Sequence, residues 1–156
     1  SGLQRSTTTL HHILDNHQCN IPTICDSLVR EREYGIFEGL THNQIQETYP
    51  LLYSSWREKE NTRIQNAETI EEVIYRGKQF LREMYKSYKN KNIIVVSHSG
   101  FMYAMYKWLH KMDLNTKPNI TISNCSSYII SFTITDDICH FTFQKDDYEF
   151  SSEVSM

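Results

Sequence analysis

The amino-acid sequence predicts an α/β domain, because a buried strand, an amphipathic helix and a C-terminal hairpin occur in one chain. Residues 93–96 are four consecutive β-branched apolar residues, which is typical of a strand covered on both faces. Residues 101–111 follow with apolar side chains at helical spacing. Two further strands are expected over 126–134 and 138–143, joined by a turn at Asp136-Asp137.

The N-terminal region predicts a helix and then a short extended segment. A stripe of apolar side chains at helical spacing runs to about residue 17 and consists of Leu3, Leu10, Ile13 and Leu14. Pro22 begins a stretch to Cys25 that suits a short strand or extended chain. Residues 28–40 show no period and contain five charged residues and two glycines. We expect an ordered loop there, and long irregular loops often carry function.

Two capping boxes predict where the middle helices begin. The first predicts a short helix through Tyr49 that Pro50 ends, and the second predicts the strongest helix of the chain over 70–88. A further helix is expected over 51–60. The boxes are formed by Thr41 with Gln44 and by Thr69 with Glu72.

The composition is that of one globular domain. The sequence has 156 residues, of which 39% are hydrophobic and 22% charged. Its net charge of -3 argues against a general nucleic-acid-binding protein. No apolar run approaches the ~20 residues that a membrane span requires, and no signal-peptide pattern is present. We therefore expect a cytoplasmic protein with neither nucleic-acid nor membrane partners, and no oligomeric state follows from the sequence.

The cysteines and the N-terminal histidines do not predict a metal site. The four cysteines lack zinc-ligand spacing and are expected to be reduced thiols: Cys19, Cys25, Cys125 and Cys139. His11, His12 and His17 are crowded near Cys19, but the step of six positions from His11 to His17 does not place both on one helix face. No metal and no cofactor is therefore expected.

Three segments carry charged residues that local secondary structure does not require: Arg5, the Arg30-Glu31-Arg32 cluster and His98. His98 lies where the expected strand ends and the next helix begins, which is the edge of an open α/β sheet where ligands bind. The small residues Ser99 and Gly100 leave backbone N–H groups at the helix start open to an anion.

These residue types suit phosphate chemistry. An arginine binds phosphate bidentately, a carboxyl group can protonate a leaving oxygen, and a histidine can donate to phosphoryl oxygens or attack phosphorus. The alternative is that His98 is a structural histidine in a strand–helix turn and that the arginines are solvated surface residues. Both the functional and the structural interpretation stay open at this point. A serine hydrolase is disfavoured, because neither Ser97 nor Ser99 lies in a Gly-x-Ser-x-Gly motif.

Five short motifs resemble those of the histidine phosphatase superfamily, which has the phosphoglycerate mutase-like fold. They occur in the family's order across residues 1–134: Ser1-x-Leu3-x-Arg5-x-x-x-Thr9, Leu28-x-x-Glu31-Arg32-x-Tyr34-Gly35-x-x-Glu38-Gly39, Ala67-Glu68-Thr69 with Arg76, Val95-Val96-Ser97-His98-Ser99-Gly100, and Asn124-Cys125-Ser126. Each motif alone is weak, and five in order are specific. The chain is most similar to the small phosphatases, including fructose-2,6-bisphosphatase-like members.

The resemblance implies a three-layer α/β/α sandwich around a mostly parallel sheet. The domain would span residues 1–145, with 41–66 as a cap over the site and 146–156 as a polar, frayed tail. In the cap, four large side chains could meet a ligand, but solvent-facing positions are the simpler expectation: Trp56, Arg57, Lys59 and Arg63.

The resemblance also implies an activity, the hydrolysis of a small phosphorylated metabolite through a phosphohistidine intermediate without a metal. His98 would match the second active-site histidine, which holds the transferring phosphoryl group. Arg5 would match the arginine that clamps this group, and Glu31 the proton donor to the leaving group. Arg32 would contact the substrate.

One part of the family pattern is missing. The family's nucleophilic histidine lies in an Arg-His-Gly motif at the end of the first strand, and this sequence contains no Arg-His-Gly and begins with Ser1. We therefore expect a domain that is truncated before Ser1, lacks its first strand and is inactive alone, although the full-length protein would be a phosphoric monoester hydrolase. The alternative is a catalytically inactive relative that binds phosphorylated ligands or a partner protein.

Overall fold

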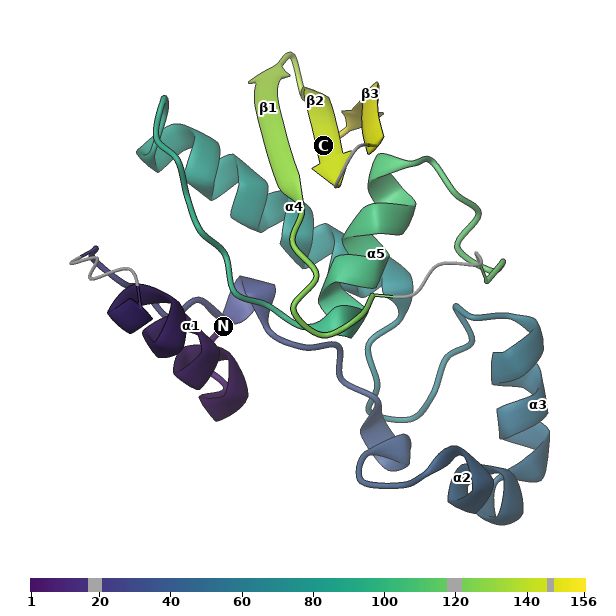
Figure 1. The fold of residues 1–156 in the computed structure, drawn as a ribbon. Coiled ribbons are helices and arrows are strands. Elements are labelled where there is room, and N and C mark those ends of the chain that lie inside the picture. The colour runs from purple at the N-terminus through teal and green to yellow at the C-terminus, as the bar shows by residue number, and fades with distance from the viewer. Residues whose placement is uncertain (17–20, 118–121, 146–147) are drawn as a thin grey trace.

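Two crossed helices form the centre of the molecule, with the remaining elements arranged around them (Figure 1). The computed structural model describes all residues except 17–20, 118–121 and 146–147. The described elements, in which η marks a short 3₁₀ turn, are α1 (Gln4–Asn16), η1 (Ser27–Val29), η2 (Gly35–Phe37), α2 (His42–Thr48), α3 (Pro50–Glu58), α4 (Ile70–Ser87), α5 (Ser99–Leu109), β1 (Ile129–Thr135), β2 (Ile138–Lys145) and β3 (Tyr148–Ser155).

Both predicted capping boxes are present and fix the starts of α2 and α4. Thr41 Oγ1 accepts from the Gln44 amide at 3.3 Å, and Gln44 Oε1 accepts from the Thr41 amide at 2.9 Å. The same exchange joins Thr69 and Glu72 at 3.2 and 2.8 Å. Each box satisfies helix-end N–H groups that lack an intrahelical partner, so these helix boundaries are encoded locally.

The main core lies between α4 and α5. Close approach of the two helices requires Gly77, because a Cβ at this position would overlap the sulfur of Met105. Val29, at the end of η1, is buried in the same core and anchors the irregular loop that follows. The other buried members of this cluster are Ile70, Val73, Ile74, Phe80, Leu81, Phe101 and Ala104.

The sheet is an antiparallel meander in the order β1-β2-β3, and it lies over the C-terminal part of α5 (Figure 1). Its inner face packs against Leu109 with four buried side chains, Cys139, Phe141, Phe143 and Val154. Residues 148–155 therefore form a paired strand, where a frayed tail was expected. Phe150 and Val154 alternate with exposed polar residues along β3, and this period of two was obscured by the polar composition.

The expected strand over 93–97 is not formed, and this is the main correction to the predicted fold. Ile93, Ile94 and Val95 are 41%, 60% and 44% exposed, and no strand in the described part of the chain pairs with them. A strand requires a neighbour that shares its hydrogen bonds, and the described chain supplies none. The described sheet is antiparallel, so the mostly parallel sheet is not observed, and the segment 22–25 also forms no regular element.

Helices α2 and α3 form a lobe beside the central helices, with a core of its own (Figure 1). Its buried members are Phe37, Ile45, Trp56 and Ile64. Trp56 therefore does not face solvent as expected, whereas Arg57 and Lys59 do. No helix in the described ranges is long and apolar enough to cross a membrane.

The docked sheet should make Cys139 unreactive. The side chain is fully buried, and burial raises the pKa of its thiol to about 11. At pH 8, iodoacetamide should modify the exposed Cys25 and Cys125 and leave Cys139 intact, as measured by peptide mass spectrometry. Ending the chain at residue 147 removes β3, including Val154, which pairs with Cys139, and should make Cys139 reactive. Unchanged protection would show that β3 does not cover it.

Candidate active site

His98 and Arg5 meet at the N-terminal end of α5. His98 is the N-cap residue of this helix and is buried. Arg5, in the first turn of α1, donates from Nε to His98 Nδ1 at 3.1 Å. Because Nδ1 accepts this hydrogen bond, the neutral ring carries its proton on Nε2, which lies 2.8 Å from Ser1 Oγ. Nε2–H is therefore the donor that His98 can offer to a ligand.

The surroundings of His98 favour its neutral form. Burial is the main cause of its lowered pKa, and the nearby cations of Arg5 and Arg76 lower the pKa further, while Glu31 opposes them. The pKa is lowered from its ordinary value of 6.5, which favours the neutral ring near pH 7. The ring thus acts as a hydrogen-bond donor, and Arg5 places a positive charge directly beside it.

The carboxylate of Glu31 is held against the same helix end. Its Oε1 accepts from the amides of Arg32 at 2.8 Å and Phe101 at 3.2 Å. Gly100 makes room for it, because a Cβ built there would lie 2.6 Å from Glu31 Oε1. The N-terminus of a helix favours a negative charge in this position. Oε2 makes no hydrogen bond to any described residue and is left available to a ligand.

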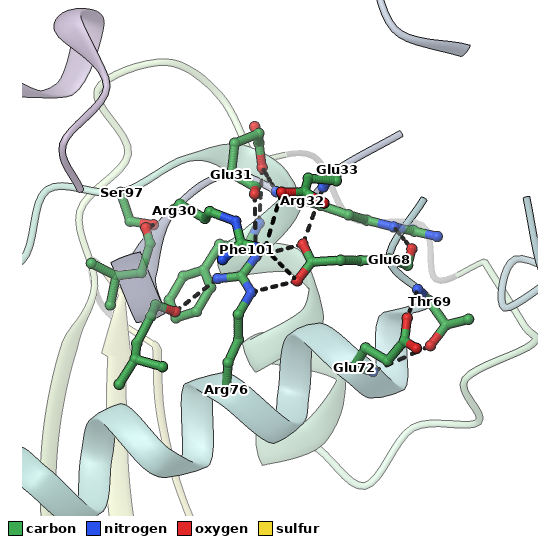
Figure 2. Close-up of polar contacts among 12 residues, drawn as sticks. Arg30, Glu31, Arg32, Glu33, Glu68, Thr69, Glu72, Arg76, Ser97 and Phe101 are labelled. Atoms are coloured by element: carbon green, nitrogen blue, oxygen red, sulfur yellow. Dashed lines mark hydrogen bonds and ion pairs between the residues drawn. The ribbon is translucent and has the colours of Figure 1, made fainter. Parts of the chain in front are cut away.

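The loop that carries Glu31 is fixed by a buried ion pair between Arg76 of α4 and Glu68 (Figure 2). Arg76 Nε and Nη2 lie 2.9 and 3.0 Å from the two carboxylate oxygens of Glu68. The same guanidinium donates to the carbonyl oxygens of Leu28 at 2.7 Å and Glu31 at 3.2 Å. One side chain thus holds both ends of the segment that presents Glu31.

Glu68 receives further support from the loop. The Glu33 amide and Arg30 Nη2 donate to its carboxylate at 3.1 and 3.4 Å, and Arg32 Nε donates to its carbonyl oxygen at 2.9 Å. Burial raises the pKa of Glu68, but the bonds from Arg76, Glu33 and Arg30 outweigh burial and lower it. The carboxylate therefore stays ionised except in acid.

The structure brings Arg5, Glu31 and His98 together, although they are far apart in the sequence. Ser99 and Gly100 form the first turn of α5 beside them. The Arg32 side chain runs away from this point, past the Glu68 carbonyl and over the Tyr34 ring, whose centroid is 5.4 Å from Cζ.

Sequence reasoning noted Glu68 and Arg76 but gave them no role. Arg76 lies on the apolar face of the expected helix, and a buried arginine needs a carboxylate as its partner. This position could therefore have indicated the ion pair. Within the described ranges, no three His, Cys, Asp or Glu side chains are grouped to hold a metal ion. His17 and Cys19 lie outside the described residues.

The arrangement suits an anion. The imidazole of His98, the guanidinium of Arg5 and the amides of the first turn of α5 lie together at this helix end, and each of these groups can donate to an anion. A carboxyl group beside them can give or take a proton.

Comparison with known proteins identifies relatives of this chain. The family model of the histidine phosphatase superfamily (branch 1) matches residues 1–141. Phosphoserine phosphatase 1 of Hydrogenobacter thermophilus is 30% identical over 131 residues, which is 83% of this chain and 61% of that protein. A 2,3-bisphosphoglycerate-dependent phosphoglycerate mutase of Cytophaga hutchinsonii is 22% identical over 93% of this chain and 70% of its own length. The chain thus spans about three fifths of the first of these curated relatives.

Solved structures share the fold. YhfR of Bacillus stearothermophilus superimposes with a TM-score of 0.75 at 19% identity, over 85% of this chain and 66% of that one. A mycobacterial glucosyl-3-phosphoglycerate phosphatase with inorganic phosphate gives 0.74 at 22% identity, over 95% and 73%. At these identities the likeness establishes an α/β fold of the histidine phosphatase type.

Loss of the buried ion pair should destabilise the whole fold. Glu68→Gln leaves Arg76 buried without a counter-charge, so we expect about 3 kcal/mol less free energy of unfolding at pH 7, measured by urea denaturation. The pKa of Glu68 is lowered in the folded state, so its stabilisation is present above about pH 4.5 and is lost as pH falls. The difference between variant and wild type should therefore shrink in acid.

The matched control is Glu72→Gln. Glu72 pairs with Arg63 at 2.6 Å, but both side chains are exposed, and glutamine preserves the capping box. We expect a loss of less than about 1 kcal/mol from this variant. Equal losses from the two variants would contradict the role assigned to the buried pair.

Proposed function

The chain belongs to the histidine phosphatase superfamily, and on that premise we propose that it is part of a phosphatase that hydrolyses a small phosphorylated metabolite. The observation that carries the proposal is the contact of Arg5 with His98 Nδ1, with Glu31 seated on the same helix end. The proposed setting is the cytoplasm, where the described free cysteines would stay reduced. Relatives named for phosphoserine and glucosyl-3-phosphoglycerate support a small organic phosphate as substrate.

The phosphoryl group would lie in front of the first turn of α5. Arg5 would neutralise its charge, and His98 Nε2–H and the amides of Ser99 and Gly100 would donate to its oxygens. The hydroxyl of Ser1, 2.8 Å from Nε2, supports the presence of space for an oxygen acceptor there. Donors fixed in this way stabilise the charge that develops on the phosphoryl oxygens during transfer.

Glu31 would act as the general acid. A nucleophilic histidine nitrogen attacks phosphorus, the bond from phosphorus to the leaving oxygen breaks, and that oxygen takes the proton of the Glu31 carboxyl group. Water then attacks the phosphohistidine and returns a proton to Glu31. The free Oε2 and the rigid seating of Oε1 support this role.

We propose that the nucleophilic histidine lies outside these 156 residues. Among the described histidines, His98 alone contacts Arg5, and it offers Nε2–H as a donor while Arg5 occupies Nδ1. The exposed apolar residues 93–95 support an additional strand beside them, which would complete a parallel sheet and the three-layer sandwich. That strand is the place where we expect the nucleophile.

The test compares the chain alone with the chain extended at its N-terminus by a strand ending in Arg-His-Gly. Alone, the chain should bind inorganic phosphate and show no turnover of p-nitrophenyl phosphate, because covalent catalysis is missing. Arg5→Gln and His98→Ala should weaken phosphate binding, measured by calorimetry. The extended chain should release phosphate and form an acid-labile phosphohistidine.

Three outcomes separate the alternatives. Turnover by the chain alone that His98→Ala abolishes would make His98 the nucleophile. Phosphate binding without turnover in the extended chain would favour an inactive phosphate-binding relative. Phosphate binding that His98→Ala and Arg5→Gln leave unchanged would remove the proposed site.

In the extended, active protein, Glu31→Gln should separate substrates by their leaving groups. A poor leaving group such as an alkyl alkoxide needs the proton, so kcat should fall about 10²–10⁴-fold. p-Nitrophenolate needs little protonation, so its kcat should fall far less. Glu33→Gln is the matched control, because it removes an exposed carboxylate from the same loop. Equal losses on both substrates would make Glu31 a structural residue.

A further inference from the structure

We infer that the lobe of α2 and α3 is a hinged cover, closed on α5 by a polar latch in which Glu60 binds Tyr103 and Lys107. The lobe would open as a folded unit, because the latch joins two bodies that each have a core of their own. This movement goes beyond the proposed function, whereas its effect on access to the anion site rests on that function.

The lobe and the central helices have separate cores. The buried side chains of the lobe, Phe37, Ile45, Trp56 and Ile64, form one cluster, and no described residue of this cluster belongs to the core between α4 and α5. Figure 1 shows α2 and α3 to one side of those two helices. Two bodies without a shared apolar core are expected to move relative to each other. The lobe can therefore turn without loss of either core.

The two chain connections to the lobe are tied together at one place. Tyr34 and Ala67 form an isolated antiparallel bridge, and the Ile36 amide donates to the Gln65 carbonyl oxygen at 3.1 Å. Gly35 permits this close approach, because a Cβ at this position would overlap that oxygen. Hinges usually consist of a few loop residues, as in this crossing of two connections. We place the pivot here, so that the lobe turns about a single point.

Away from the pivot, Glu60 supplies a buried contact between the two bodies. It follows α3 and is 7% exposed, and its Oε2 accepts from Tyr103 Oη and Lys107 Nζ, both at 2.8 Å. Burial and the bond to Glu60 raise the pKa of Tyr103, so its hydroxyl stays protonated as the donor. Lys107 is fully buried and directs its other two protons to the carbonyl oxygens of Leu114 and Thr116 at 3.1 and 2.7 Å. The donors of the latch are therefore satisfied in the closed lobe.

Further contacts across the joint are also polar. Asn61 Oδ1 accepts from the Ile70 amide at 2.9 Å, and the exposed Arg63 pairs with the exposed Glu72. When the two bodies separate, water can replace hydrogen bonds and ion pairs of this kind, so the net cost of opening is small. An apolar joint would instead expose apolar surface to water. The polar joint is thus suited to reversible opening.

Tyr34 links the position of the lobe to the candidate site. Its ring packs against the lobe cluster, and a Cβ built on Gly100, in the first turn of α5, would lie 3.0 Å from its hydroxyl oxygen. Glu31, three residues before Tyr34, is bound to the same helix end. Closure therefore brings a side chain of the lobe cluster to the edge of the space before α5, and opening would withdraw it. The lobe would thereby control access to the anion site.

The test is a measurement of the distance between two spin labels by double electron–electron resonance. The labels are attached through Leu51→Cys in the lobe and Tyr75→Cys in α4, both at exposed positions. Three native cysteines are first changed to serine: Cys19, Cys25 and Cys125. We expect one narrow distance distribution for the closed lobe. Lys107→Met and Glu60→Gln each leave one member of the pair without its counter-charge, so the lobe should open to hydrate it and the distribution should broaden.

An apolar triple variant distinguishes a latch from a general loss of structure. Glu60→Met, Tyr103→Phe and Lys107→Met together replace the polar group by apolar side chains, which is often neutral or stabilising, so the distribution should become narrow again. Glu58→Gln is the matched control, because it removes an exposed carboxylate at the end of α3 and should change nothing. Amide hydrogen exchange in α4 should stay slow in all these variants, which shows that the central core remains folded.

Two sets of outcomes decide the inference. A narrow distribution in both Lys107→Met and Glu60→Gln, or a triple variant as broad as these single variants, would overturn the latch. In stopped-flow experiments, the closed triple variant should bind inorganic phosphate more slowly than Lys107→Met, and equal association rates would show that the lobe does not control access. If none of the proteins binds phosphate, the proposed function fails, while the distances still decide whether the lobe is hinged.

Discussion

The ion pair of Arg76 with Glu68 is the interaction on which the candidate site depends. It lies between α4 and the irregular loop, with side chains 7% and 13% exposed. Through it, the loop carbonyls of Leu28 and Glu31 gain hydrogen bonds that secondary structure would supply elsewhere. A loop without helix or strand periodicity therefore becomes rigid enough to hold a carboxylate in one place. The energetic reason is that each buried charge is tolerated only in the presence of the other.

The helices could be predicted from the sequence because their signals are local. The capping boxes at Thr41 and Thr69 need only residues three positions apart, and both formed as expected. Local signals could not show whether residues 93–97 form a strand, because a strand requires a neighbouring strand that shares its hydrogen bonds. β3 was not predicted for a different reason. Phe150 and Val154 follow the period of two that is typical of a strand, but the residues around them are mostly polar.

The residues of the candidate site could be predicted from the sequence, but the contacts that hold them could not. Motif order indicated that Arg5, Glu31 and His98 belong together, and the structure places them at one helix end. Motif order does not show what holds them, because the roles of Glu68 and Gly100 arise from contacts across the fold. Gly100 was expected to offer its amide to an anion. Its lack of a side chain also admits the Glu31 carboxylate.

The long sequence separation within the site has a consequence for how the protein acquires function during synthesis. The Arg5–His98 contact joins residues 93 positions apart, and the bonds from Phe101 to Glu31 and from Ser97 to Val29 span 70 and 68 positions. Closing loops of this size costs conformational entropy, so these contacts form slowly. The hairpins of the sheet join residues that are close in sequence and form faster. On the ribosome, Arg5 and Glu31 emerge long before α5 can meet them. A nascent or partly folded chain would therefore contain helices and hairpins but no anion site, and ligand binding would report completion of the fold.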